Sequence, residues 1–245
     1  MAGRHATVVQ IFAHEPELLQ HVPEAEADAA RHRTVVTSLT LPAGDLTPPA
    51  VRSDPFDLGF LVLEGLMLRR VEVAGGRTVE LLGAGDVIRP WREPADDAMV
   101  RVREHWRICE PTRIAVLDRR FEQDVARWPG VVAGLLDRVA LRAEALSVQL
   151  ALAQLPRLET RLLFMFWHIA ARFGHVEPRG VALPPLTQET LAEMTASRRP
   201  SVNGALARLR DRGLIVNGRH GCWCLLGEPA DAEDLVRAHR LVSLT

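Results

Sequence analysis

Residues 187–221 constrain the fold of this chain more than any other segment. They read TQETLAEMTASRRPSVNGALARLRDRGLIVNGRHG and contain two apolar helical patterns with a short break between them. The apolar positions are Leu191 and Met194 in the first pattern, then Val202, Leu206 and Leu209 in the second. This spacing predicts two short amphipathic helices joined by a turn, which is the layout of a helix-turn-helix.

The second predicted helix opens on two adjacent arginines, Arg198 and Arg199. In a helix-turn-helix, the N-terminal side chains of the second helix meet base edges in the DNA major groove. The alternative is a helical hairpin within a core, but core hairpins rarely expose two adjacent arginines at a helix start. Residues 213–216, a turn at 217–221 and an alternating run at 222–225 then predict a β-hairpin "wing".

The charge of the chain favours a local contact with DNA over a global one. The net charge is −1 and the isoelectric point about 6.8, so the whole protein does not attract a polyanion. Residues 187–221 nevertheless hold six arginines and three acidic residues, a net charge of +3.

The N-terminal half has a different pattern. Residues 1–31 are acidic and predict two short helical pieces, whereas residues 34–118 consist of short alternating runs broken by Gly, Pro and Asp. This pattern predicts a small β-barrel or jelly roll with a tight turn at residues 83–86. Strands are expected at residues 35–41, 59–63, 67–73 and 114–117.

One long helix is expected over residues 129–155, and it carries a heptad seam. The seam consists of Val132, Leu136, Val139, Ala143, Leu146, Leu150 and Ala153. A second apolar stripe consists of Leu141, Val148, Leu152 and Leu155. One stripe can pack on the helix's own barrel while the seam needs a partner, so we expect a parallel homodimer. A helix buried within one subunit is the alternative.

Pro156 ends this helix, because proline lacks a backbone donor and disfavours helix at the preceding residue. We place a hinge there, expect a further helix at 158–173, and expect a Pro/Gly-rich loop at 174–185. The predicted class is α+β: a double-stranded β-helix (jelly-roll) sensor domain over 1–128, a dimerisation helix and hinge over 129–156, and a winged helix-turn-helix over 157–245.

This architecture resembles the Crp/Fnr family of bacterial transcription regulators. The residues that match the family pattern are Leu186, Thr187, Leu191, Ala192, Val202, Leu206, Leu209, Gly213, Leu214 and Ile215. The sequence departs from the pattern where Thr195-Ala196 replaces the usual glycine of the turn, where Pro200 replaces a base-recognising Glu, and where Gly204 replaces an Arg. The run from Leu81 to Ile88 also looks like the family's glycine turn.

The resemblance implies a sequence-specific regulator that binds double-stranded DNA as a dimer on a pseudo-palindromic site. Arg199 is expected to recognise a guanine, Ser197 to cap the second helix, and Thr187 to cap the first helix and contact a phosphate. The full set of expected DNA-binding residues is Thr187, Ser197, Arg198, Arg199, Ser201, Asn203 and Arg219. RNA polymerase is a further partner of such regulators.

The sensor residues argue against cyclic AMP as the effector. Members that bind it carry Gly-Glu after the glycine turn and Arg-Ser or Arg-Thr further on, whereas this chain has Arg89-Pro90-Trp91 and lacks the later pair. A cyclic dinucleotide, another small ligand, or no effector at all stays open. Candidate effector-binding residues are Arg89, Trp91, Arg92, Arg101, Arg103 and Trp106, and the alternative is that the tryptophans are core and the arginines solvated.

Other chemistries fit the sequence poorly. The only cysteine in the sensor half is Cys109, whereas an iron–sulfur cluster needs four thiolates. Residues 34–118 hold one histidine, His105, so a metal-dependent cupin-type enzyme is disfavoured, and no histidine stands out as a haem ligand. We therefore expect no metal, no cofactor and no enzymatic activity. Without an apolar run long enough to span a membrane or a signal pattern, a cytoplasmic protein is expected.

Overall fold

The computed structural model describes residues 6–46, 58–90, 99–218 and 221–228, and the chain divides into two compact units, residues 1–144 and 145–245. The division falls inside one long helix, α4 (Pro129–Ala153). The domain boundaries at residues 128 and 156 stay predictions. No helix among the described residues is long and apolar enough to cross a membrane.

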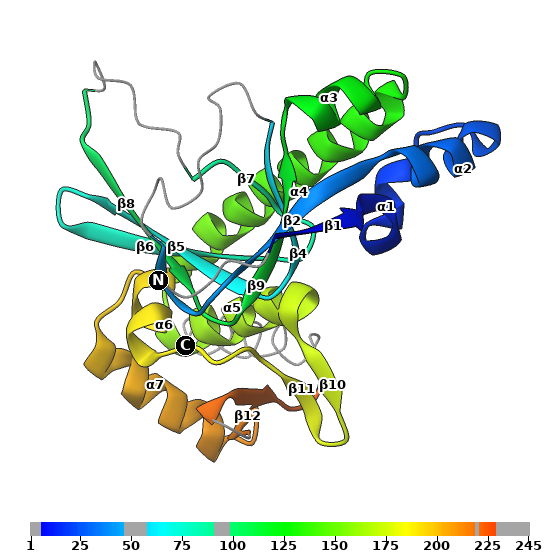
Figure 1. The fold of residues 1–245 in the computed structure, drawn as a ribbon. Helices are drawn as coiled ribbons and strands as arrows, with labels where there is room; N and C mark the ends of the chain where they lie inside the picture. Colours follow the sequence, from blue (N-terminus) through cyan, green and yellow to red (C-terminus); the bar gives the residue numbers. More distant parts are fainter. Residues whose placement is uncertain (1–5, 47–57, 91–98, 219–220, 229–245) are drawn as a thin grey trace. The chain divides into compact units, whose positions relative to one another are not determined.

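The N-terminal unit is built on two antiparallel sheets (Figure 1). Their strand orders are β1-β2-β9-β4-β7 and β3-β8-β5-β6. The strands are β1 (Ala6–Gln10), β2 (Val35–Leu41), β3 (Gly44–Leu46), β4 (Gly59–Glu64), β5 (Leu66–Val73), β6 (Gly76–Gly83), β7 (Val87–Ile88), β8 (Val102–Ile108) and β9 (Thr112–Leu117). All four predicted strands are present, and β1, β3, β6, β7 and β8 were not anticipated.

Strand β4 is buried on both faces and separates two hydrophobic cores. Phe60 and Val62 contribute to the core that also holds Trp106 of β8, whereas Leu61 and Leu63 pack with the helices of this unit. The alternation of side chains along a strand explains why neighbouring residues serve different cores. The helices here are α1 (Ile11–His14), the 3-10 helix η1 (Pro16–Leu19), α2 (Glu24–Arg33), α3 (Arg119–Val125) and the first part of α4.

Close packing explains one glycine of α4. A Cβ added to Gly130 would lie 2.2 Å from the backbone oxygen of His21, so only glycine lets the helix approach the segment after η1 this closely. Further along, Val131 and Leu135 are buried in the helical core, and Arg138 and Arg142 follow at the same helical spacing. Two apolar residues and two arginines thus form the side of α4 that packs on its own unit.

For Leu141, the predicted packing of the second apolar stripe on the β-barrel was wrong. Leu141 lies in the same unit as the barrel and is 58% exposed, so it does not pack on the barrel. The spacing of apolar residues does not reveal Arg138 and Arg142, because both are charged. Their guanidinium groups form ion pairs with glutamates inside the unit.

The C-terminal unit holds the rest of α4, then α5 (Leu158–Phe173), α6 (Gln188–Met194) and α7 (Arg199–Asp211). Its sheet has the order β10-β11-β13-β12, formed by β10 (His175–Glu177), β11 (Gly180–Ala182), β12 (Ile215–Asn217) and β13 (Trp223–Leu225). The prediction of a loop at 174–185 was wrong, because β10 and β11 form a hairpin there. The predicted wing is present as the β12–β13 pair.

Helix α5 contributes several buried apolar residues to the core of this unit, namely Leu162, Leu163, Met165, Phe166 and Ile169. Phe166 is fully buried and stacks on Trp223 of the wing with ring centroids 6.5 Å apart. On α7, Val202 and Leu209 are buried at 0% exposure, so the apolar face of the second helix predicted from the sequence is the face that packs inward. The opposite face of α7 carries mostly exposed residues.

Candidate nucleic-acid interface and sensor site

A side-chain cap fixes the start of α6. Thr187 Oγ1 accepts a hydrogen bond from the backbone N–H of Thr190 at 3.1 Å, which satisfies one of the donors that a helix start leaves unpaired. The predicted capping role of Thr187 is confirmed. Its side chain is exposed, and its contact with a DNA phosphate stays a prediction.

Ser197 does not cap α7, so that prediction was wrong. Arg198 precedes the helix, and no side-chain hydrogen bond caps it. The Ser197 hydroxyl instead lies 2.8 Å from Thr195 Oγ1 and 3.1 Å from the Thr195 carbonyl oxygen. Thr195 is fully buried, and its hydroxyl donates to the Leu191 carbonyl at 2.6 Å. The two hydroxyls therefore stabilise the turn between the helices.

Ala196 gives this turn an unusual backbone. Its φ is 47°, in the left-handed region that costs a non-glycine residue roughly 1–2 kcal/mol. In the Crp/Fnr pattern, the usual glycine of the turn stands where this chain has Thr195-Ala196. The backbone at Ala196 therefore has the left-handed conformation that glycine adopts easily, although the residue is alanine.

Arg161 of α5 ties this turn to the end of α4. Its Nε donates to the Leu155 carbonyl at 3.0 Å, and its Nη1 donates to the Thr195 carbonyl. One half-buried guanidinium therefore joins the segment before Pro156 to the residue that precedes Ala196. Sequence reasoning missed Arg161, because it stands in an amphipathic helix and outside the helix-turn-helix motif.

The start of α7 presents an exposed polar surface. Four of the expected DNA-binding residues at this helix start are exposed, whereas Ser197 is only partly exposed and Val202 is fully buried. These exposed residues are Arg198, Arg199, Ser201 and Asn203. Pro200 fits the first turn, where a backbone N–H has no intrahelical acceptor. Arg219 lies outside the described residues.

A further arginine of α7 is engaged within the protein. Arg208 Nε donates to Glu159 at the start of α5. The pKa of Glu159 is lowered: partial burial would raise it, but a backbone hydrogen bond and the Arg208 guanidinium outweigh that effect. Arg208 thus holds α7 against α5, which leaves Arg198 and Arg199 as the stronger candidates for DNA.

Four of the six candidate effector-binding residues fall within the described residues, and their role stays a prediction. Trp91 and Arg92 lie outside the described residues, and Arg89 is exposed after β7. Arg101 and Arg103 are also exposed. On β8, Arg103 and Trp106 point to opposite faces of the sheet, because side chains alternate along a strand. Trp106 is only 4% exposed and belongs to the core between the sheets.

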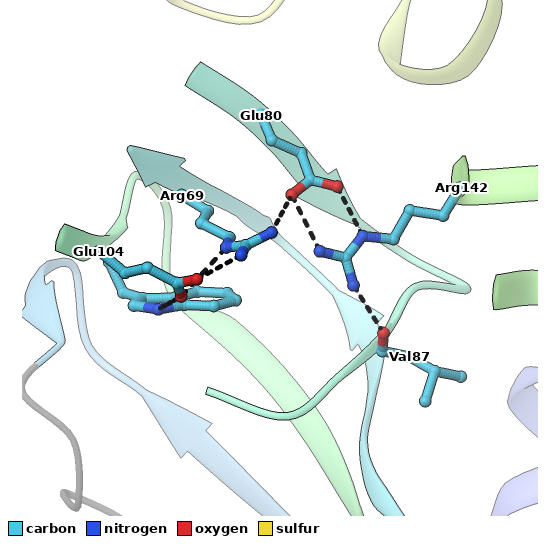
Figure 2. Close-up of polar contacts among 6 residues, drawn as sticks. Arg69, Glu80, Val87, Glu104 and Arg142 are labelled. Carbon is cyan, nitrogen blue, oxygen red and sulfur yellow. Dashed lines mark hydrogen bonds and ion pairs between the residues drawn. The ribbon is translucent and has the colours of Figure 1, made fainter. Parts of the chain in front are cut away.

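An ion-pair network instead joins α4 to the sheet β5-β6-β8 (Figure 2). Arg142 donates through Nε and Nη2 to the two oxygens of Glu80, the second at 2.9 Å, and through Nη1 to the Val87 carbonyl at 3.1 Å. Arg69 lies 3.2 Å from the same Glu80 carboxylate and also binds Glu104. The Glu80 side chain is 8% exposed, so this contact is largely screened from water.

The network continues to Trp106. Glu104 accepts from Trp106 Nε1 at 3.2 Å, and the Arg69 guanidinium lies over the indole ring, 5.6 Å from its centroid. Burial acts to lower the pKa of Arg69, but hydrogen bonds and charges of Glu104 and Glu80 raise it above its ordinary value. The positive charges of the two arginines and the negative charges of the two glutamates compensate each other within this network.

A second set of ion pairs involves Arg138, which lies one helical turn before Arg142 on α4. Arg138 Nη2 donates to Glu15 at 2.9 Å and to Glu17 at 2.7 Å. Burial raises the pKa of Glu15; Arg138 opposes this, while Glu17 and Asp86 add to it. Asp86 itself accepts from the Gly83 N–H at 2.8 Å, within the tight turn predicted at residues 83–86.

The heptad seam is exposed in the single chain. Leu136 is 64% exposed, and most other large members of the seam are exposed as well. These exposed members are Val132, Val139, Leu146 and Leu150. A set of apolar side chains at heptad spacing on one helix is typical of a partner helix interface.

Residues 157–227, which contain this helix-turn-helix, match the Crp-like helix-turn-helix domain family. No curated protein matches the sequence. The fold resembles that of a CooA variant from Carboxydothermus hydrogenoformans, with TM-score 0.60, 19% identity, and coverage of 81% of this chain and 86% of that chain.

Two further solved structures have a similar fold. A CRP/FNR-family transcriptional regulator from Thermus thermophilus has TM-score 0.52 and 22% identity, over 82% of this chain and 98% of that chain. CLP, the c-di-GMP-responsive global regulator of Xanthomonas campestris, has TM-score 0.55 and 15% identity, over 88% of this chain and 99% of that chain.

Residues 157–227 therefore belong to the Crp-like helix-turn-helix family, and most of the chain has the fold of the Crp/Fnr transcription regulators. The resemblance expected from the sequence and the predicted α+β class are both confirmed. The family match covers the C-terminal part of the chain, and the likeness to solved structures concerns the fold.

Proposed function

We propose that this protein is a sequence-specific DNA-binding transcription regulator that acts as a homodimer in the cytoplasm. The observation that supports this most directly is the exposed start of α7 within a Crp-like helix-turn-helix domain. Its residues provide two guanidinium groups, a hydroxyl and an amide on one helix end, which is the chemistry that base edges and phosphates bind.

Arg199 is the side chain that we expect to recognise a base. A guanidinium can donate two hydrogen bonds to O6 and N7 of guanine, a contact worth about 1–3 kcal/mol of discrimination. Thr187, at the start of α6, and Arg198 would contact phosphates and so position the helix without selecting a sequence. Pro200 and Gly204 offer no hydrogen-bonding side chain, so the operator should differ from that of regulators that carry Glu and Arg there.

The exposed heptad seam supports a parallel dimer. Burial of its leucines and valines against a second copy would remove apolar surface from water and stabilise the pair. A two-fold dimer presents two recognition helices, so its operator should be a pseudo-palindrome with half-sites about one helical turn apart.

The ion-pair network favours a regulator that binds DNA without a small effector. Arg142 already connects α4 to β6 and β7, and the Glu80 and Arg69 side chains beside it are paired. An anionic ligand would have to displace Glu80 and leave a buried carboxylate without its partner, which is costly. A cyclic dinucleotide or other non-cAMP ligand remains the second candidate.

The test uses the full-length protein and DNA selected from random oligonucleotides. The wild type should enrich a two-fold motif without any added ligand. Arg199→Ala should lose one base preference in each half-site, whereas Arg212→Ala, which removes an exposed arginine from the other end of α7, should keep the motif and weaken all sequences alike. Absence of an enriched motif for the wild type would overturn the proposed function. An unchanged motif for Arg199→Ala would overturn the assignment of this residue.

A second measurement addresses the effector. Addition of cyclic AMP or cyclic di-GMP should leave the dissociation constant for the selected site within about twofold and should not raise the melting temperature. A tenfold gain in affinity with either ligand, equal to about 1.4 kcal/mol, would contradict effector-independent binding.

A further inference from the structure

Asn203 and Gln188 form a hydrogen bond across the exposed surface of the helix-turn-helix. Gln188 is the first residue of α6, and Asn203 lies one turn after Arg199 on α7. Gln188 Nε2 donates to Asn203 Oδ1 at 3.3 Å, and both contacting groups are exposed. The two helices are thus linked on the side that faces solvent, next to the arginine that we expect to contact a base.

The helical positions place Asn203 beside Arg199. At about 100° per residue, four residues bring Asn203 to within about 40° of Arg199, whereas Ser201 lies about 160° away from it. Val202 and Leu206 are buried on the inward face. Asn203 is therefore the polar residue best placed to contact the base pair next to that of Arg199.

The bond to Gln188 fixes which end of the amide is available. An asparagine amide has one accepting oxygen and one nitrogen with two donors. Because the oxygen turns toward Gln188, the nitrogen turns away from it. Asparagine selects adenine by using both ends at once, accepting from N6 and donating to N7. Gln188 uses one of the two lone pairs of the Asn203 oxygen and turns that oxygen toward α6, so the two N–H donors are the groups that the amide presents away from Gln188.

We propose that Asn203 is a second specificity-determining residue, and that Gln188 is its positioning residue. In the DNA complex, which rests on the proposed function, Asn203 donates to a base edge that bears acceptors, either guanine O6 and N7 or thymine O4. Because the oxygen is turned toward Gln188, this orientation favours those bases over adenine, which needs the oxygen and the nitrogen together. The base pair concerned lies next to the guanine contacted by Arg199.

Selection from random oligonucleotides tests this with four full-length proteins. The wild type should prefer guanine or thymine at one position beside the Arg199 guanine. Asn203→Ala should lose that preference, about fivefold or more, and keep the rest of the motif. Gln188→Glu cannot donate to the Asn203 oxygen and should accept from its nitrogen. The turned amide then presents its oxygen, and the preference should shift to adenine or cytosine, whose exocyclic amines are donors. Asp211→Asn, at the far end of the same helix, should keep the wild-type motif.

The outcomes separate this inference from the proposed function. If the wild type enriches a motif and Asn203→Ala enriches the same one at every position, Asn203 does not recognise a base. If Asn203→Ala changes the motif but Gln188→Glu does not, Gln188 does not orient the amide. Both results would overturn the proposal while leaving a sequence-specific regulator. A purely structural role for Gln188 would lower affinity for all sequences alike and would not exchange one base for another.

Discussion

Arg142 and Glu80 form a two-point ion pair that connects the long helix α4 to strand β6 within the N-terminal unit. The third donor of the same guanidinium binds the Val87 carbonyl at 3.1 Å. Three hydrogen bonds from one side chain fix both the position and the rotation of α4 at this point. Lysine could not reproduce them, because an ammonium group lacks the planar fork of donors.

Replacement of Arg142 should therefore destabilise the N-terminal unit. In Arg142→Met, Arg69 is the remaining arginine beside the buried Glu80 carboxylate, so the negative charge of Glu80 is only partly compensated. We expect a loss of about 3 kcal/mol in the free energy of unfolding. Arg103→Met is the matched control, since Arg103 is exposed and lies 3.8 Å from Glu72. That change should cost under about 0.5 kcal/mol. Calorimetry of the full-length variants measures both, and equal losses would refute a special role for Arg142.

Ala196→Gly should stabilise the helix-turn-helix. Glycine adopts the positive φ of this turn without strain, and after allowance for its greater freedom in the unfolded chain we expect a gain of about 0.5–1 kcal/mol. Ala207→Gly, in the interior of α7, should instead lose about 1 kcal/mol. Urea denaturation followed by circular dichroism compares the two. A loss of stability for Ala196→Gly would show that the turn is not strained.

Two exposed leucines on different sides of α4 test the dimer interface. Leu136→Glu introduces a charge into the heptad seam and should convert the dimer to a monomer at micromolar concentration. Leu141 is similarly exposed but lies on the second stripe, so Leu141→Glu should leave the dimer intact. Analytical ultracentrifugation gives the mass of each. Dissociation by Leu141→Glu alone would move the interface to the other side of α4.

His168 of α5 gives the C-terminal unit a pH dependence. Burial lowers the pKa of His168; a hydrogen bond with the backbone of Ala145 opposes this, and the charge of Arg172 adds to it. Because the folded state binds this proton less readily than the unfolded state, stability is full above the ordinary pKa of about 6.5 and declines as the pH falls toward the lower folded-state pKa.

His168→Gln should remove the part of the loss of stability at low pH that His168 causes. Denaturation curves between pH 9 and pH 5 measure the free energy of unfolding: the wild type should lose more stability than the variant below pH 7.5, and the difference between them should be constant above pH 7.5. Parallel curves throughout the range would show that His168 does not cause the dependence.

The helices of this chain could be predicted well from its sequence, because their apolar residues recur at helical spacing. The predicted helix at 158–173 coincides with α5, and α4 ends two residues before the predicted end. Strand β6 was not predicted, because residues 79–83 are all buried and show no alternation of buried and exposed side chains. Strand β8 escaped because Arg103, Glu104 and His105 make it look like a polar loop.

The ion-pair network of the N-terminal unit could not be predicted for a different reason. Arginines were counted as solvent-facing or ligand-binding groups, yet Arg142 and Arg69 find their partners in glutamates of distant strands. Such pairings depend on strand register, which a single sequence does not reveal. The exposed arginines at the start of α7 were predictable, since their place follows from the helix-turn-helix motif itself.

Arg161 has a consequence for how the C-terminal unit opens. Its bond to the Thr195 carbonyl joins residues 34 apart in the chain and closes α5, the β10–β11 hairpin and α6 into one loop. Segments bridged in this way unfold together, because local unfolding of either segment breaks the hydrogen bond between Arg161 and Thr195. The amides of α6 and the second half of α5 should thus exchange with solvent deuterium at a common rate, as one cooperative unit.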